Sequence, residues 1–189
     1  MPRLTPSPIH LRLAVRHLRA GGVIAYPTEG VWGLGCDPDN IGALLRLLLL
    51  KQRDPAKGLI LIAASEAQLA PRLAPLSAAQ QAALRASWPG PVTWIVPHNK
   101  SISLLVTGGR STVAARVSAH PIASALCRAF GGPLISTSAN PSGRPAATSA
   151  LAVRRYFGDQ LDYILPGALG GRRGPSEIRD LLNDKLLRG

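Results

Sequence analysis

The sequence predicts an α/β fold in which helices cover a sheet. Short apolar runs typical of buried strands alternate with longer segments of helical periodicity, and turn residues separate the two kinds. The 189 residues suffice for one domain, since a chain of this size buries roughly two-thirds of its unfolded surface. No repeat or long interior linker divides the chain. We therefore expect a single domain over residues 1–189, with a core of about 8–182 and a short tail at 183–189.

The helices are predicted from apolar periodicity and from signals at their ends. The first carries apolar side chains among Arg and His and ends at Gly21-Gly22. Asp37 to Asn40 offer capping side chains for an apolar helix that brings Lys51 to its C-terminal end. Ser77-Ala78-Ala79-Gln80 has the pattern of a capping box. The expected helices are 8–20, 41–50, 65–73, 77–88, 121–130 and 148–157.

The strands are predicted from short apolar runs between these helices. They are expected at 23–26, 59–63, 92–96, 112–117 and 133–136, and their spacing does not fix their order in the sheet. Strand alternation puts Arg116 on the same face as Thr112 and Ala114. An arginine there either forks onto a carboxylate or phosphate or pairs with a neighbouring acid. The Gly- and Arg-rich stretch 167–189 is either an ordered flap or a loose tail.

The composition favours an anionic partner and argues against several classes of protein. The formal net charge is +12, which attracts polyanions, although 18 of the 22 basic residues are Arg, so a compositional bias is an equal explanation. Cys36 and Cys127 have neither zinc-site nor disulfide spacing, so we expect reduced thiols. Neither a signal peptide nor an apolar run of membrane-spanning length is present, so we expect a soluble cytoplasmic protein with no membrane contact. The chain also lacks the GxSxG and HExxH motifs of hydrolases and peptidases.

Lys51, Arg53 and Lys57 form the most informative motif, because three cations lie within seven residues on a short loop with Pro55. The apolar run Leu59–Ala63 follows directly and predicts a buried strand that would hold the loop in place. A phosphate site on a rigid base is one interpretation. The other is electrostatic, because cations are favourable at a helix C-terminus even without a ligand.

Two further loops follow predicted strands, where open α/β sheets commonly bind ligands. One runs from Tyr26 to Gly35 and is rich in glycine, and the other runs from Ser136 to Gly143 and is rich in hydroxyls. Each pattern is also typical of an ordinary turn. Cations, hydroxyls and backbone donors, usually with Mg²⁺, are what phosphoryl or nucleotidyl transfer requires.

In this order the motifs resemble the YrdC/TsaC family of threonylcarbamoyl-AMP synthases, in its short single-domain bacterial form. The resemblance covers residues 20–180, almost the whole chain. The matching segments are VIAYPTEGVWGLGCDP from Val23, LKQRDPAKGLILIA from Leu50, WPGPVTWIV from Trp88, TVAARVSAHP from Thr112, PLISTSANPSG from Pro133 and PSEIRD from Pro175. Asp54 and Pro141 stand where the family commonly has Pro and Leu.

The resemblance implies a fold and a reaction. The fold is a YrdC-like twisted mixed sheet with helices around a deep basic central cavity. The reaction joins L-threonine, bicarbonate and ATP into threonylcarbamoyl-adenylate and releases pyrophosphate, with Mg²⁺ accompanying ATP and no organic cofactor. Transfer proteins then use the product to modify the adenosine beside the anticodon of tRNA.

The resemblance also assigns residue roles. The Lys-x-Arg and Ser-x-Asn signatures fall on Lys51 and Arg53 and on Ser138 and Asn140, which are the expected catalytic residues and are expected to pair across the cavity. ATP contacts are implied for Arg53, Lys57, Thr112 and Ser138. Threonine contacts are implied for Thr28, Ile62, Arg116, Ser136 and Ser176, while the Mg²⁺ ligands stay unassigned.

Two alternatives share this fold. A non-catalytic RNA-binding module would use the same basic surface, and the net charge permits it. The second alternative is a carbamoyl-transfer domain of the hydrogenase-maturation type. Such domains belong to long multidomain chains, which this sequence does not resemble.

Overall fold

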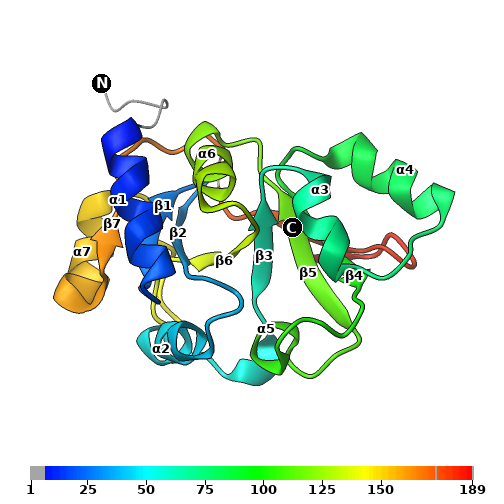
Figure 1. Cartoon of the computed structure of the whole chain (residues 1–189), viewed down its shortest axis with the longest axis horizontal. Coiled ribbons are helices and arrows are strands. Elements are labelled where there is room, and N and C mark those ends of the chain that lie inside the picture. The colour runs from blue at the N-terminus through cyan, green and yellow to red at the C-terminus, as the bar shows by residue number, and fades with distance from the viewer. Residues whose placement is uncertain (1–6, 173, 189) are drawn as a thin grey trace.

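One mixed sheet runs through the computed structural model, which describes residues 7–172 and 174–188 (Figure 1). Over these residues nine strands pair in the order β7-β1-β2-β6-β3-β5-β4-β8-β9. The pairs β1–β7, β3–β5 and β4–β8 are parallel and the others antiparallel. The strands are β1 Ile24–Pro27, β2 Trp32–Gly35, β3 Ile60–Ala63, β4 Val92–Pro97, β5 Thr112–Val117, β6 Leu134–Ser138, β7 Tyr163–Ile164, β8 Glu177–Asp180 and β9 Leu186–Arg188.

The helices begin at capping residues that the sequence predicts. The Asn40 side chain accepts from the backbone N–H of Ala43 at 2.9 Å, and Ser77 and Gln80 form the expected capping box. The α-helices are α1 Pro8–Arg19, α2 Ile41–Lys51, α3 Glu66–Leu69, α4 Ala78–Ser87, α5 Leu104–Thr107, α6 Pro121–Phe130 and α7 Ala150–Phe157. Short 3₁₀ turns occupy Pro55–Lys57, Ala70–Arg72 and Gly158–Gln160.

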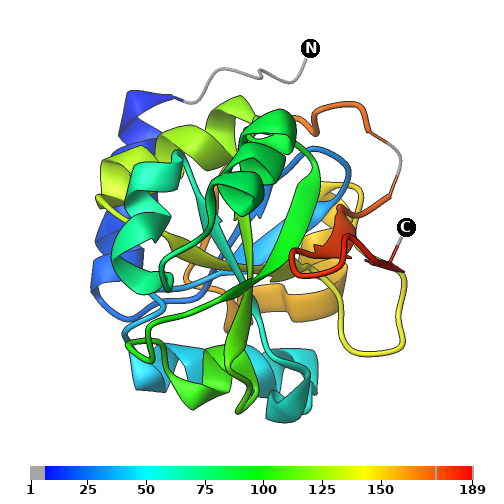
Figure 2. The same ribbon diagram turned by 90° about the vertical axis from the view of Figure 1, so that its right-hand side faces the viewer.

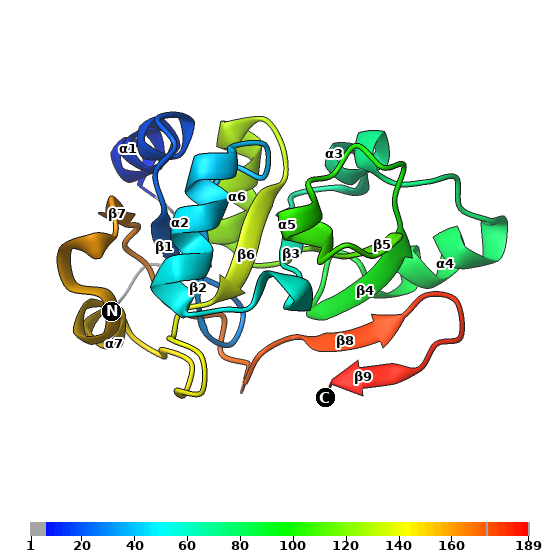
Figure 3. The same ribbon diagram turned by 90° about the horizontal axis from the view of Figure 1, so that it is seen from below.

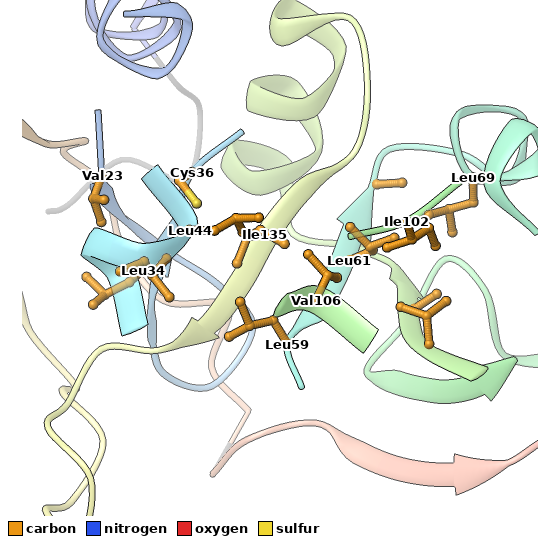
Figure 4. Close-up of a cluster of buried hydrophobic side chains, with 14 of the residues drawn as sticks. Val23, Leu34, Cys36, Leu44, Leu59, Leu61, Leu69, Ile102, Val106 and Ile135 are labelled. Carbon is orange, nitrogen blue, oxygen red and sulfur yellow. The ribbon is translucent and has the colours of Figure 1, made fainter. Parts of the chain in front are cut away.

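The two faces of the sheet have different cover. On one face, side chains from β1, β2, β3, β5 and β6 pack against α2, α5 and α7 in one continuous cluster that includes Leu34, Leu44, Leu61 and Ile135 (Figure 4). On the other face, α1 and α6 lie side by side and cover only part of the sheet, packing on Tyr26 (Figure 1). The rest of that second face is left for a pocket.

The α/β prediction is confirmed, but two local predictions are wrong. Trp32–Gly35, expected as part of a loop, is strand β2. Glycine is required there because a Cβ at Gly35 would lie 2.4 Å from the carbonyl oxygen of Ile135 and 2.7 Å from the Tyr26 ring. The expected helix at 65–73 divides into α3 and a 3₁₀ turn that contains Pro71.

The C-terminal stretch follows the ordered-flap alternative over its described residues. Strand β8 extends the sheet beside β4, and β9 folds back on β8 (Figure 3). Figure 2 shows this hairpin in red at one end of the sheet. The pairing takes residues distant in sequence and places them next to the pocket, and local sequence patterns do not reveal such pairing.

Candidate active-site pocket

A pocket of about 450 Å³ opens on the part of the sheet face that α1 and α6 leave uncovered. Strand alternation explains its position: on β3, Ile62 packs into the core under α6, whereas Ile60, two residues earlier on the same face, lines the pocket. The turn between β1 and β2, the loop after α2, β5, β6 and the C-terminal hairpin supply the remaining walls.

The pocket lining is rich in cations. Its six basic side chains come from segments far apart in the sequence, and Glu29 is the acidic residue among the lining residues of the described chain. The six are Arg53, Lys57, Arg110, Arg116, Arg172 and Arg188. Desolvation and the neighbouring charges of Arg116 and Arg53 lower the pKa of Arg188. Like charges held this close favour an anionic ligand. The depth of the predicted cavity stays a prediction.

The loop that follows α2 holds Arg53 in the lining of the pocket. Its Nε and Nη2 atoms donate to the carbonyl oxygen of Gly58 at 3.1 and 2.9 Å. The pKa of Arg53 is lower than usual, because burial lowers it more than the nearby charge of Asp54 raises it. Lys57, which is exposed, ends the 3₁₀ turn between them. Gly58 has φ +65° and is in close contact with the backbone of Val106, so a side chain at that position would push the loop away.

Lys51 lies behind this loop and not in the pocket lining. Its side chain is 2% exposed, and Nζ donates to the carbonyl oxygens of Ser138 and Asn140 at 2.5 and 2.7 Å. Burial and the charge of Arg53 lower the pKa of Lys51 to about 8. The backbone N–H of Ser142 donates to the Lys51 carbonyl oxygen at 2.8 Å. Lys51 therefore ties the end of α2 to the turn after β6.

Arg116 lies farther along the sheet than Arg53, because it pairs with Ile62 on β3 whereas Arg53 is bound to Gly58 just before β3, and this separation defines two ends of the pocket. Arg116 is paired with an acid. Its Nη1 atom donates to Glu29 Oε2 at 3.0 Å, and the Arg116 and Glu29 side chains are 7% and 12% exposed. The Arg116 Nε atom is buried without a hydrogen-bond partner among the described residues. A buried donor of this kind is costly unless something accepts from it, which indicates a ligand position beside Arg116.

Hydroxyl groups line the wall between the two ends. Ser136 and Ser138 lie two residues apart on β6 and share its pocket face. The Thr28 hydroxyl donates to the Val31 carbonyl oxygen at 2.7 Å, and the Ser176 and Thr93 hydroxyls are 2.9 Å apart. A hydroxyl that donates to one partner can still accept from another, so these groups can contact a ligand.

The structure brings together eight of the eleven residues that the resemblance singles out. Thr28, Arg53, Lys57, Thr112, Arg116, Ser136, Ser138 and Ser176 all line the pocket. Lys51, Ile62 and Asn140 are outside the lining.

Three details differ from the expectation. Ile62 is fully buried in the core under α6, so its side chain does not face the pocket. The Asn140 side chain donates to the carbonyl oxygens of Pro141 and Arg144 and holds its own turn. The expected pairing across the cavity is correct only for Lys51, and through backbone oxygens, because Arg53 donates to Gly58 instead.

Sequence reasoning missed several pocket residues. Glu29 stands inside the quoted motif, but nothing local indicates that it reaches β5. Arg110 precedes β5 in a loop, and Arg172 and Arg188 belong to the C-terminal stretch. For Arg172 and Arg188 the only signal was the concentration of arginine and glycine in that stretch.

The chain is similar to proteins of one known family. A family model named for Sua5, YciO and YrdC, and described as telomere recombination, matches residues 16–189. The chain belongs to this family. A protein of Halorhodospira halophila named threonylcarbamoyl-AMP synthase is 56% identical over 96% of this chain and 95% of its own. One of Nitrosococcus oceani with the same name is 54% identical over 94% and 96%.

Solved structures agree on the fold. The P. abyssi Sua5 structure complexed with L-threonine superposes with a TM-score of 0.89 at 33% identity and covers 94% of this chain. The chain spans about half of that protein, namely 53% of its length. E. coli YciO superposes with a TM-score of 0.84 at 28% identity, covering 99% of this chain and 91% of its own. Among the described residues, no helix has the length and apolar character needed to cross a bilayer.

Proposed function

We propose that this protein is a threonylcarbamoyl-AMP synthase, a nucleotidyltransferase that makes threonylcarbamoyl-adenylate and pyrophosphate from L-threonine, bicarbonate and ATP. The observation that carries the proposal is the convergence of eight motif residues from separate segments on one cation-rich pocket. Relatives of nearly the same length carry that name, and the superposed Sua5 structure is complexed with L-threonine.

The end of the pocket around Arg53 and Lys57 suits the triphosphate of ATP. Neither side chain, nor Arg110 beside them, lies within ion-pair distance of a carboxylate among the described residues. Their positive charges attract phosphate more strongly as negative charge builds on the departing pyrophosphate, and that is where stabilisation raises the rate. Thr112 and Ser138, on adjoining walls, are proposed to contact the nucleotide.

The end around Arg116 suits the amino acid. One guanidinium edge is held by Glu29, and the buried Nε atom lacks an acceptor, so a single carboxylate can complete the arrangement. Thr28, Ser136 and Ser176 are proposed to contact L-threonine on this side.

The chemistry needs no protein nucleophile. The threonine amine forms a carbamate with bicarbonate-derived CO₂, and a carbamate oxygen then attacks the α-phosphorus. The bond to the β-phosphate oxygen breaks, and pyrophosphate leaves with that electron pair. The pocket holds two anions in line despite their mutual repulsion, which is the main contribution of the protein. Lys51 contributes by fixing the turn that carries Ser138.

Mg²⁺ is proposed to enter with ATP. The described residues contain no group of three His, Cys, Asp or Glu side chains that could hold a metal, and the lining carboxylate, Glu29, is occupied by three donors. Mg²⁺ commonly keeps several waters and binds through substrate phosphates, which fits this lining. The ion would neutralise phosphate charge beside Arg53.

Use of the product on tRNA by threonylcarbamoyl-transfer proteins, in the cytoplasm, completes the proposal. The test measures pyrophosphate release by purified protein with Mg²⁺ and ATP, with L-threonine and bicarbonate each omitted in turn. Release that needs both supports the proposal. Release that needs neither would contradict the proposed substrates. No release, together with salt-sensitive binding of structured RNA, would favour the RNA-binding module instead.

A further inference from the structure

Glu29 lies in the turn between β1 and β2, and its carboxylate is fully engaged. Oε2 accepts from Arg116 Nη1 at 3.0 Å. Oε1 accepts from the Ser118 hydroxyl at 2.7 Å and from the backbone N–H of Ala119 at 3.1 Å. These partners lie on β5 and in the loop before α6, so one carboxylate joins the glycine-rich turn to the strand that carries Arg116.

The environment argues against Glu29 as a proton acceptor. Burial alone would raise the pKa of Glu29, but the Arg116 charge and the Ser118 hydrogen bond, with a smaller contribution from His120, lower it below the usual value. A carboxylate with a low pKa and three donors is a weak base at neutral pH. We therefore look for a structural role of Glu29, in the groups that its carboxylate binds.

What Glu29 holds is the orientation of Arg116. With Nη1 fixed, the remaining edge of the planar guanidinium has one direction in which to donate, and the buried Nε atom on that edge has no partner among the described residues. Without Glu29 the guanidinium could rotate, and the neighbouring charge of Arg188 would repel it.

The same turn is bound to the C-terminal segment. The backbone N–H of Arg172 donates to the Glu29 carbonyl oxygen at 3.0 Å, and that of Gly170 to the Thr28 carbonyl oxygen at 3.1 Å. The two backbones are so close that a Cβ on Gly30 would lie 1.9 Å from the Gly174 carbonyl oxygen. The position of Glu29 is thus fixed from two sides.

We infer that Glu29 is a positioning residue that supports amino-acid binding in the pocket by holding Arg116 in the orientation that receives the substrate carboxylate. The inference rests on the proposed function, since it takes L-threonine as the ligand. It assigns Glu29 no contact with a reacting atom. The consequence is a loss confined to amino-acid binding when Glu29 is changed.

The test introduces Glu29→Gln into the wild type and into an Arg116→Ala variant. Pyrophosphate release is measured, and KM is determined separately for L-threonine and for ATP. We expect E29Q to raise KM for L-threonine by about tenfold or more and KM for ATP by less than about threefold. In an Arg116→Ala background the same change should raise KM for L-threonine by less than about twofold, because Glu29 acts through Arg116.

Asp162→Asn is the matched control. Asp162 pairs with Arg46 at 2.6 Å, and neither residue lines the pocket. It should lower the unfolding midpoint without changing either KM. If E29Q does not fold, the test uses Glu29→Asp, because this change keeps the negative charge and shortens the side chain by one methylene group. E29D should show the same selective rise in KM, to a smaller extent.

Three kinetic results would overturn the inference. These are an equal rise in both KM values, a full effect of E29Q in the R116A background, and a fall in kcat with loss of the acid limb of its pH profile, which would make Glu29 a base. A wild-type protein that does not bind L-threonine would overturn the proposed function as well. A wild type that binds L-threonine as tightly as E29Q does would overturn the inference alone.

Discussion

The two ends of the pocket hold their arginines in opposite ways. Arg53 donates to a carbonyl oxygen of its own loop, and its charge lies beyond ion-pair distance of any described carboxylate. Arg116 is buried, and one edge of its guanidinium is bound to Glu29. The first arrangement leaves the charge of Arg53 unpaired within the described chain, so it can attract a polyanion. The second leaves one oriented edge of the Arg116 guanidinium, which can bind a single carboxylate.

Arg53→Ala should give the largest effect. Removing a fixed cation from the site where charge develops should lower kcat/KM by about 10²- to 10³-fold. The assay is pyrophosphate release, with Arg85→Ala, on the exposed side of α4, as the control that keeps normal turnover. A loss below about threefold would remove Arg53 from the nucleotide end.

Arg116→Lys tests geometry against charge, because lysine keeps the charge and loses the fork. We expect KM for L-threonine to rise by about 10- to 100-fold, with KM for ATP nearly unchanged. If the R116K variant keeps a normal KM for L-threonine, the orientation of the guanidinium is not what binds the amino acid.

Lys51→Met should affect stability as well as activity. It leaves the carbonyl oxygen of Asn140 without the Lys51 donor and that of Ser138 with only the backbone N–H of Asn140, which should cost about 2–4 kcal/mol of unfolding free energy. Urea denaturation measures the loss, and turnover should fall because the Ser138 turn loosens. Strongly reduced turnover with unchanged stability would instead place Lys51 in direct contact with the substrates.

The Glu29–Arg116 pair should make stability depend on acid. The pKa of Glu29 is lower in the folded protein than its ordinary value of 4.5, so the pair contributes fully above that value and loses its contribution as pH falls through the lowered pKa. Denaturation of wild type and E29Q at pH 7 and at about pH 3.5 checks this, and the difference between them should shrink in acid. A constant difference would mean that the charge of Glu29 does not stabilise the fold.

Thr28→Val should give the smallest effect. It deletes a hydroxyl at the amino-acid end while keeping the shape of the side chain, so KM for L-threonine should rise by about 5- to 10-fold and KM for ATP should stay constant. Equal losses for both substrates would contradict the position given to Thr28.

Helix caps and strand alternation could be predicted from the sequence because both are local signals. Capping at Asn40 and Ser77, and the alternation that puts Arg116 on the face of Thr112, follow from neighbours in the chain. The partner of Arg116 could not be predicted, because Glu29 is 87 residues away and reaches it only through the pairing of strands. Lys51 was predicted beside Ser138 and Asn140, but spacing along the chain does not show that its buried ammonium donates to their backbone oxygens.

Direct binding of each substrate to single variants tests the division of the pocket most directly. Isothermal titration would measure ATP and L-threonine on wild type, Arg53→Ala and Arg116→Ala. The division predicts that R53A weakens ATP and leaves L-threonine within about threefold, and that R116A does the reverse. Comparable weakening of both ligands by either variant would contradict it.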